Sequence, residues 1–221
     1  MKFLPSRQGR RVFGEFCEEY DLVYFGDVLK SDDGYHRIDG LTQSPAASDS
    51  NYCAGDVYEY PVVILERTLR QPTGGKTKLG RPATRRLNWT ILQISLRRAR
   101  APHIFINGRR HSDRLYASLS ASFLRLTAIP AANLPAGTPA DFARNFSLFA
   151  QPDALGTIAA IFPPTVAATL GAYFADFDFE LNQDKLIVYA AGAVADLKLL
   201  DLMLRGGLFL ARHLDSLIAE N

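Results

Sequence analysis

The strongest pattern in this chain is a helical repeat of apolar residues close to its C-terminal end. Apolar side chains recur there at spacings of three and four, and charged residues fall between them. This spacing predicts a long amphipathic helix, in which Gly206-Gly207 predicts a kink or a close approach of another segment. The apolar positions are Leu197, Leu200, Leu204, Leu208, Ala211, Leu214 and Ile218.

Shorter helices are predicted at three other places. Residues 9–20 place apolar side chains one helical turn apart, and a second helical pattern follows Ser112, whose side chain can cap a helix. Pro163-Pro164 divides the uncharged stretch 154–175 into two further helical pieces. The prolines, glycines and threonines of that stretch favour two buried segments over a membrane-spanning helix.

Strand patterns dominate the first half of the chain. Residues 88–97 alternate, so that Leu92 and Ile94 would face one side of a sheet and Trp89 and Ile91 the other. Asp33-Gly34 lies between two β-rich runs and predicts a tight hairpin turn. Residues 52–60 and 61–70 are predicted to form one long strand or two. Further strands are predicted at 103–106 and 146–150, and a hairpin at 177–181 and 186–190.

Three segments have no periodicity and are predicted to be irregular. Residues 42–51 form a polar loop, and residues 71–86, rich in glycine, proline and basic residues, form an exposed loop. Residues 126–140 hold three prolines and no charge, which is typical of a linker. Together these elements predict one α+β domain over 1–221, with an antiparallel sheet in its first half and mixed strands and helices in its second. Sub-lobes at 1–125 and 141–221 would meet at the linker.

Composition restricts the class of protein further. The chain has 221 residues, 48% of them hydrophobic and 22% charged, which excludes disordered, collagen-like and disulfide-scaffold proteins. Its two cysteines, Cys17 and Cys53, lack a CxxC spacing and predict neither a zinc site nor a redox motif. No apolar run follows the basic N-terminal residues, so we expect no export signal, no transmembrane segment and a cytoplasmic location.

Charge is strongly segregated along the chain although its net value is only +2. Residues 15–66 contain twelve acids and two bases, whereas residues 67–112 contain twelve bases and no acid. In one interpretation the two blocks pair across neighbouring strands. In another, the basic block binds an anionic partner, either nucleic acid or an anionic membrane surface. In a third, acidic and basic faces of two copies associate. The anion-binding candidates are Arg81, Arg85, Arg86, Arg97, Arg98 and Arg100.

Catalytic and cofactor motifs do not emerge from the sequence. Residues 74–77 resemble the end of a phosphate-binding loop, but Arg70 stands where its first glycine belongs and no helical run follows. No nucleophile signature accompanies the four histidines, and Cys53 is best explained as a buried thiol. We therefore predict no catalytic residue, no cofactor and no metal site. The nearest approach to a metal cluster is the set Asp32, Asp33, His36 and Asp39, part of which the predicted hairpin turn already explains.

Four stretches of sequence are similar to a family of uncharacterised bacterial domains, some of whose members are membrane-associated. They read DSNYCAGDVYEYPVVILERT, NFSLFAQPD, IFPPTVAATL and FDFELNQDKLIVYAA. The resemblance implies a bacterial α+β domain that works at the inner membrane face. It implies no catalytic residue for this chain.

These observations favour a non-catalytic interaction or scaffold module that binds an unidentified protein partner or a second copy of itself. Two alternatives stay open. The chain is instead an anion-binding module for nucleic acid or a membrane surface, or an enzyme whose site is built from residues scattered along the sequence. A cleft lined by His36 or His103 with two carboxylates in reach would favour the enzyme.

Overall fold

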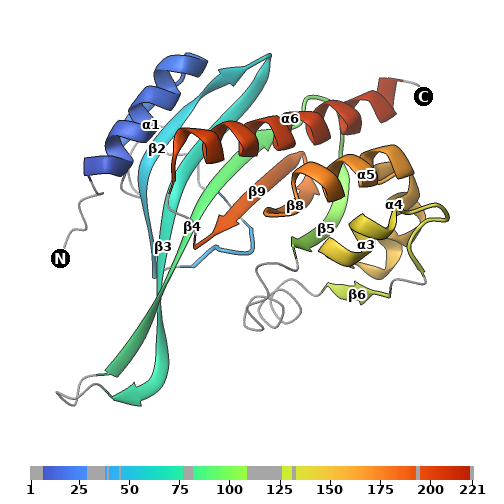
Figure 1. The fold of residues 1–221 in the computed structure, drawn as a ribbon, viewed down its shortest axis with the longest axis horizontal. Coiled ribbons are helices and arrows are strands. Elements are labelled where there is room, and N and C mark those ends of the chain that lie inside the picture. The colour runs from blue at the N-terminus through green and yellow to red at the C-terminus, as the bar shows by residue number, and fades with distance from the viewer. Residues whose placement is uncertain are drawn as a thin grey trace.

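The computed structural model of this chain describes residues 7–28, 38, 40–44, 46–76, 82–108, 126–130, 133–192 and 195–219. The described part forms a nine-stranded antiparallel sheet with five α-helices (Figure 1). The strand order is β1-β2-β3-β4-β9-β8-β5-β7-β6, and the longest helix ends the chain. The predicted α+β class is confirmed.

The bounds of the elements show which segments the sheet brings together. The strands are β1 (Val23–Gly26), β2 (Ala47–Val57), β3 (Tyr60–Lys76), β4 (Pro82–Ser95), β5 (Ala101–Gly108), β6 (Thr127–Ile129), β7 (Phe146–Ala150), β8 (Asp178–Gln183) and β9 (Lys185–Ala191). The helices are α1 (Arg7–Tyr20), α3 (Ala140–Asn145), α4 (Leu155–Ile161), α5 (Pro164–Tyr173) and α6 (Leu197–Ala219), with a 3₁₀ turn η3 (Pro152–Ala154). Strand β9 pairs with β4, and β5 lies between β8 and β7, so segments far apart in the sequence alternate in the sheet.

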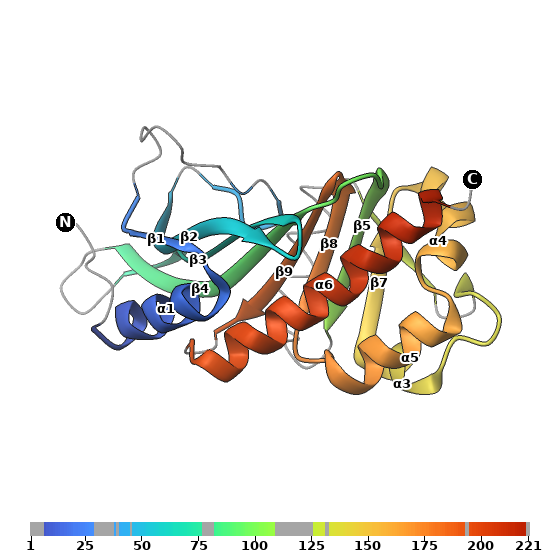
Figure 2. The ribbon, with the colours of Figure 1, turned by 90° about the horizontal axis from the view of Figure 1, so that it is seen from above.

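Helices α1 and α6 lie on the same face of the sheet, and α6 crosses the strands diagonally (Figure 2). The apolar stripe predicted for the last helix forms this contact, since Leu200 and Leu204 are buried in the same cluster as Ile94 of β4. A Cβ added at Gly207 would lie 2.7 Å from Ile94 Cδ1. The glycine therefore lets α6 approach β4, as the sequence predicted.

The opposite face of the sheet carries a second hydrophobic cluster, which includes Leu65, Ile91, Phe105 and Tyr189. The alternation predicted along β4 is confirmed, because Leu92 and Ile94 belong to the helix-side cluster while Trp89 and Ile91 belong to the second one. Both faces of the central strands are buried.

Strands β3 and β4 continue beyond their neighbours as a two-stranded ribbon (Figure 1). The outermost register pairs with the neighbouring strands join Leu69 of β3 to Ala47 of β2 and Trp89 of β4 to Ala191 of β9. We call residues 70–76 and 82–88 the ribbon. The prediction of an exposed loop over 71–86 is wrong for the described residues, which are strand; residues 77–81 lie outside the described part. The described side chains of the ribbon are exposed or half-buried, so its sequence lacks the alternation that marks a strand with one buried face.

Other expectations have mixed outcomes. The short N-terminal helix, the helices on either side of Pro163-Pro164, strand β7 and the β8–β9 hairpin are confirmed. The polar loop predicted over 42–51 is wrong in part, because β2 begins at Ala47, and the linker predicted over 126–140 contains β6. Strand β1 pairs with β2. The turn predicted at Asp33-Gly34 and the helix predicted after Ser112 lie outside the described residues. Within the described ranges, no helix combines the length and the apolar character that a membrane span requires.

Candidate functional site: a basic hollow over the C-terminal helix

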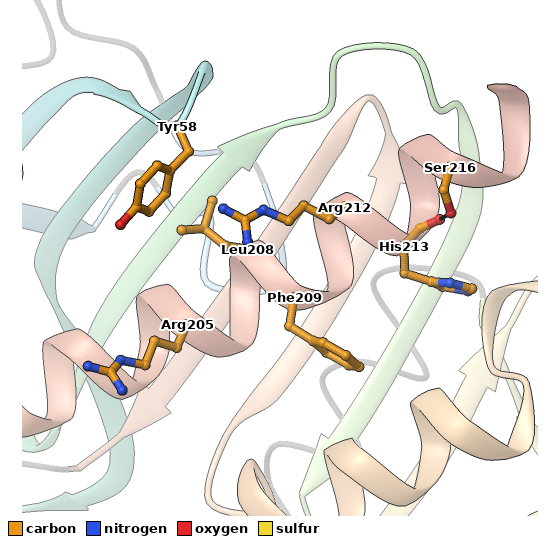
Figure 3. A pocket seen from close by; sticks show the side chains of 7 residues that line it. All are labelled: Tyr58, Arg205, Leu208, Phe209, Arg212, His213 and Ser216. Carbon is orange, nitrogen blue, oxygen red and sulfur yellow. Dashed lines mark hydrogen bonds between the residues drawn. The ribbon is translucent and has the colours of Figure 1, made fainter.

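A surface hollow of about 640 Å³ lies over α6, and we call it the α6 hollow. One of its lining residues comes from the β2–β3 turn and the others come from α6 (Figure 3). Arg205, Phe209, Arg212 and Ser216 follow one another at helical spacing, so they share one face of the helix. The lining residues are Tyr58, Arg205, Leu208, Phe209, Arg212, His213 and Ser216.

The β2–β3 turn brings Tyr58 to the hollow in a strained backbone conformation. Val57 pairs with Tyr60, so Tyr58 and Glu59 form a two-residue turn. Their φ angles are 47° and 70°, in the left-handed region that favours glycine or asparagine. Neither residue is a glycine or an asparagine, so nothing in the sequence marks this turn and 52–70 is equally compatible with one strand or two.

Two contacts hold the turn in place over α6. The guanidinium carbon of Arg212 lies 5.2 Å from the centre of the Tyr58 ring, a cation–π arrangement. Glu59 accepts a hydrogen bond from Arg97 Nη1 at 2.5 Å. Figure 3 shows the Arg212 side chain extending toward Tyr58, while His213 lies at the other end of the hollow.

The hollow is positively charged above an apolar floor. Arg205 forms an ion pair with Asp201 at 2.9 Å, and this contact raises the pKa of the arginine. Arg212 stacks on Tyr58 and forms no ion pair with the described residues. Leu208 is buried, and the ring of Phe209 stacks on Phe174 with 6.4 Å between ring centres. The arrangement can accept an anionic group beside an apolar one.

Asp215 fixes the chain next to the hollow by capping three successive backbone N–H groups. Its carboxylate accepts hydrogen bonds from the N–H groups of Arg97, Arg98 and Ala99 at 3.1, 2.9 and 2.8 Å. Burial on its own raises the pKa of Asp215, but these donors outweigh it and the pKa is lowered. The end of α6 is thereby tied to the β4–β5 connection.

The structure divides the anion-binding candidates into two groups. Arg85 and Arg86 lie exposed on the ribbon, whereas Arg97, Arg98 and Arg100 follow the opposite end of β4. Arg97 lies eleven positions after Arg86 along mostly extended chain, a span of roughly 35 Å. Arg81 lies outside the described residues. The described anion-binding candidates therefore fall into two groups at opposite ends of β4.

Part of the segregated charge pairs inside the molecule. Arg67 and Asp49 face each other across β3 and β2 and form an ion pair at 2.7 Å with both side chains 3% exposed. Arg97 pairs with Glu59, as described above. Arg100 pairs outside the acidic block, with Asp184 at 3.4 Å. The ribbon arginines lie beyond the last pair between β2 and β3.

A polar cluster lies on the second face of the sheet, around the fully buried Glu180. Its carboxylate accepts hydrogen bonds from the Tyr189 hydroxyl at 2.6 Å and from the Leu41 N–H at 2.8 Å, and it lies 2.8 Å from His103 Nε2. A side chain at Gly40 would collide with Glu180 and Tyr189. These contacts fasten residues 40–42 to the sheet, so the cluster has a clear structural role. Among the described residues, one carboxylate lies within hydrogen-bonding distance of His103.

The remaining candidates for chemistry are buried or lie outside the described residues. Cys17 and Cys53 are free and buried, and contact with Cys17 together with burial raises the pKa of the Cys53 thiol, which disfavours the reactive thiolate. The described residues contain no group of three or more side chains placed to hold a metal ion. The cluster of Asp32, Asp33, His36 and Asp39 falls in the part that the structure does not describe.

Comparison with known proteins shows a shared fold. No family model matches the sequence, and no curated protein sequence matches it. Among solved structures, the chain is similar to the crystal structure of the mycobacterial trehalose monomycolate transport factor A, TtfA. The TM-score is 0.55 at 11% sequence identity, and the alignment covers 96% of this chain and 95% of that one. At this identity the likeness shows the fold, which the two chains share over almost their whole lengths.

Proposed function

We propose that this chain is a non-catalytic interaction module, and that its α6 hollow binds an acidic segment of a partner protein. The observation that carries the proposal is the strained turn that holds an exposed Tyr58 against Arg212. Two adjacent non-glycine residues in the left-handed region cost on the order of 1–3 kcal/mol each. Such strain persists where neighbouring contacts hold it, and it gathers at functional sites.

The chemistry of the hollow matches the residues that dominate protein interfaces. Tyrosine and arginine are enriched among the residues whose removal weakens binding most. Tyr58 is 67% exposed, and Arg212 lies beside it over Leu208. In a partner segment with a carboxylate next to an apolar side chain, the carboxylate would contact the guanidinium groups and the apolar side chain would pack on Leu208.

The fold shared with TtfA supports an accessory role. That protein is described as a transport factor, and the likeness extends over nearly all of this chain. Two free cysteines fit a reduced, cytoplasmic compartment, which we propose as the location. Two alternatives remain predictions. One is peripheral association with the inner membrane face, and the other is an enzyme whose site is built from residues scattered along the sequence.

The test compares retention of partner proteins from native lysate by the wild-type chain and by charge-reversal variants at low and high salt. Arg212→Glu removes the stacked cation from the hollow, and Lys198→Glu makes the same charge change on an exposed residue of the same helix. A specific partner should be retained by wild type and Lys198→Glu and reduced at least about thirtyfold with Arg212→Glu, the effect of a hot-spot residue. Equal retention by the two variants would exclude the α6 hollow as the binding site.

Self-association is the competing interaction, because opposite charges on two copies could meet. Sedimentation at 50 mM and 500 mM salt separates the two cases. A dimer that dissociates at high salt, with no other protein retained, would replace the partner proposed above with a second copy of this chain.

A further inference from the structure

Two buried polar side chains on the second face of the sheet carry oxygen atoms without a hydrogen-bond partner. Asp178 is 1% exposed and Asn107 is 7% exposed. Asp178 Oδ1 accepts a hydrogen bond from the Gly108 N–H at 2.7 Å, but Asp178 Oδ2 and Asn107 Oδ1 have no partner in the described structure. A buried acceptor left without a donor costs free energy, most of all when it belongs to a carboxylate. These two oxygens therefore call for a donor.

The sheet places the two side chains directly opposite each other. Ile106 of β5 is the register partner of Phe179 of β8. The next residues along the two antiparallel strands are Asn107 and Asp178, which therefore oppose each other on the same face. That face is the one with the second hydrophobic cluster, since Phe105 lies two positions before Asn107 and belongs to it. Opposed Cβ atoms lie about 4.5–5.5 Å apart, so one small group can contact both oxygens.

An apolar surface and a half-buried position adjoin the two oxygens. Phe105 and Phe149 are register partners in the next row of the same face, with 6.2 Å between their ring centres. On the β7 side, Asn107 is opposite Ser147, whose side chain is half-buried. The register between β6 and β7 ends at Leu148, next to Ser147. A ligand can therefore approach the two oxygens from the β7 side and place an apolar part on the two rings.

The chemistry of the two oxygens selects the class of ligand. An ionised carboxylate and an amide oxygen accept hydrogen bonds and donate none, so the ligand must bring the donors. An ammonium group has three N–H donors and a single positive charge, which matches one carboxylate and one amide oxygen. Ca²⁺ takes about 6–8 oxygen ligands and Mg²⁺ needs an octahedron of them. The described residues contain no group of three or more side chains placed to hold a metal ion.

We propose that Asp178 and Asn107 bind the ammonium group of a primary alkylamine whose apolar chain packs on Phe105 and Phe149. The ammonium N–H groups donate to Asp178 Oδ2 and Asn107 Oδ1, and the positive charge keeps the carboxylate ionised inside the sheet. The site lies on the face of the sheet opposite α6. It therefore goes beyond the protein interaction proposed for the α6 hollow.

The experiment measures the urea midpoint of the full chain at pH 8 in the chloride salts of butylammonium, methylammonium and tetramethylammonium. Each salt is used at about 200 mM, and a ligand that binds only the folded state raises its stability. Tetramethylammonium has no N–H donor and serves as the reference. Butylammonium should raise the wild-type midpoint most, because its chain buries apolar surface on the phenylalanine rings, and methylammonium should raise it less.

Two variants locate the binding. Asp178→Asn keeps the acceptor for Gly108 and removes the carboxylate, so its midpoint should be the same in the three salts. Asn107→Leu removes one of the two oxygens and should raise the apparent dissociation constant for butylammonium at least about tenfold, the effect of one hydrogen bond to a charged group. Asp176→Asn changes an exposed carboxyl and should respond to the amines as wild type does.

Three results would overturn the proposal. Equal wild-type midpoints in the three salts would leave a proton shared between Asp178 and Asn107 as the occupant of the site. A rise in Asp178→Asn as large as in wild type would show that the amine acts elsewhere. Potassium chloride with the same effect as butylammonium would favour a metal ion. Circular dichroism checks that each variant is folded, and the comparison of the three salts on wild type depends on no variant.

Discussion

Arg67 lies 3% exposed in the sheet, where it makes several hydrogen bonds at once. Its guanidinium donates two hydrogen bonds to the Asp49 carboxylate, and Nη1 also donates to the Ile38 carbonyl and the Thr42 hydroxyl. Replacement by methionine would leave Asp49 as a buried carboxylate without its counter-charge. We expect Arg67→Met to lower the free energy of unfolding by about 3–5 kcal/mol, measured by urea denaturation.

A second variant separates the buried charge from simple loss of packing. Arg67→Met/Asp49→Leu removes both charges and keeps apolar volume at both positions. Since apolar replacement of a whole buried ion pair is often close to neutral, this variant should regain most of the lost stability. A double variant as unstable as the single one would show that the hydrogen bonds to Ile38 and Thr42 matter more than the buried charge.

Asp178 gives the protein a pH-dependent stability. The side chain is 1% exposed, and its Oδ1 accepts a hydrogen bond from the Gly108 N–H while Oδ2 has no partner in the described structure. Burial raises the pKa of Asp178 to about 7, against a lowering effect of the Gly108 N–H. The folded state therefore binds a proton that the unfolded state has lost between about pH 4 and pH 7. Stability should fall as the pH rises through that window, by up to about 4 kcal/mol.

Asp178→Asn should remove this dependence, because asparagine keeps the acceptor for Gly108 and carries no charge. Urea midpoints at pH 5 and pH 8 provide the measurement. The wild-type chain should lose stability between the two values relative to the variant. Asp176→Asn changes an exposed carboxyl two residues earlier and should behave as wild type. A wild-type midpoint that moves with pH as little as that of Asp178→Asn would contradict the prediction.

At the scale of elements, glycine-to-alanine substitutions in α4 and α5 distinguish the effect of helix propensity on stability from the effect of packing. A Cβ at Gly171 of α5 would lie 2.9 Å from the backbone nitrogen of Phe142, whereas a Cβ at Gly156 of α4 would have no atom within 4 Å. Alanine in a helix is about 1 kcal/mol more favourable than glycine. We expect Gly156→Ala to raise the urea midpoint and Gly171→Ala to lower it, since α3 must move to accommodate the methyl group. Stabilisation by both substitutions would mean that α3 and α5 separate freely.

The elements that the sequence predicted well are those whose apolar residues pack against the core at a regular spacing. The apolar stripe of α6 and the alternation along β4 follow directly from contact with the core, and both were readable. The ribbon was missed because its described side chains are exposed or half-buried, so no alternation of apolar and polar residues marks it. The pairing of β1 with β2 could not be read from the sequence, because pairing order depends on contacts between segments that are far apart in it.

The candidate site was predictable only in part. The sequence shows that the basic residues are clustered between 67 and 112. It does not show that Arg86 and Arg97 lie roughly 35 Å apart, because that distance follows from the length of β4. Arg205, Phe209 and Arg212 could have been grouped from their helical spacing on the face away from the stripe. The presence of Tyr58 in the α6 hollow could not have been predicted, because its turn contains no glycine or asparagine to mark a left-handed conformation.

At the scale of the whole molecule, the sheet order predicts a single cooperative unit. Strand β9 pairs with β4, and β5 is held between β8 and β7, so neither half of the chain completes its own sheet. The one tryptophan, Trp89, lies in β4, while α6 supplies the longest helix. Tryptophan fluorescence and the helical circular dichroism signal should therefore lose their native values at the same urea midpoint. Two separate midpoints would instead show that sub-lobes 1–125 and 141–221 unfold independently, and that the β4–β9 pairing is too weak to couple them.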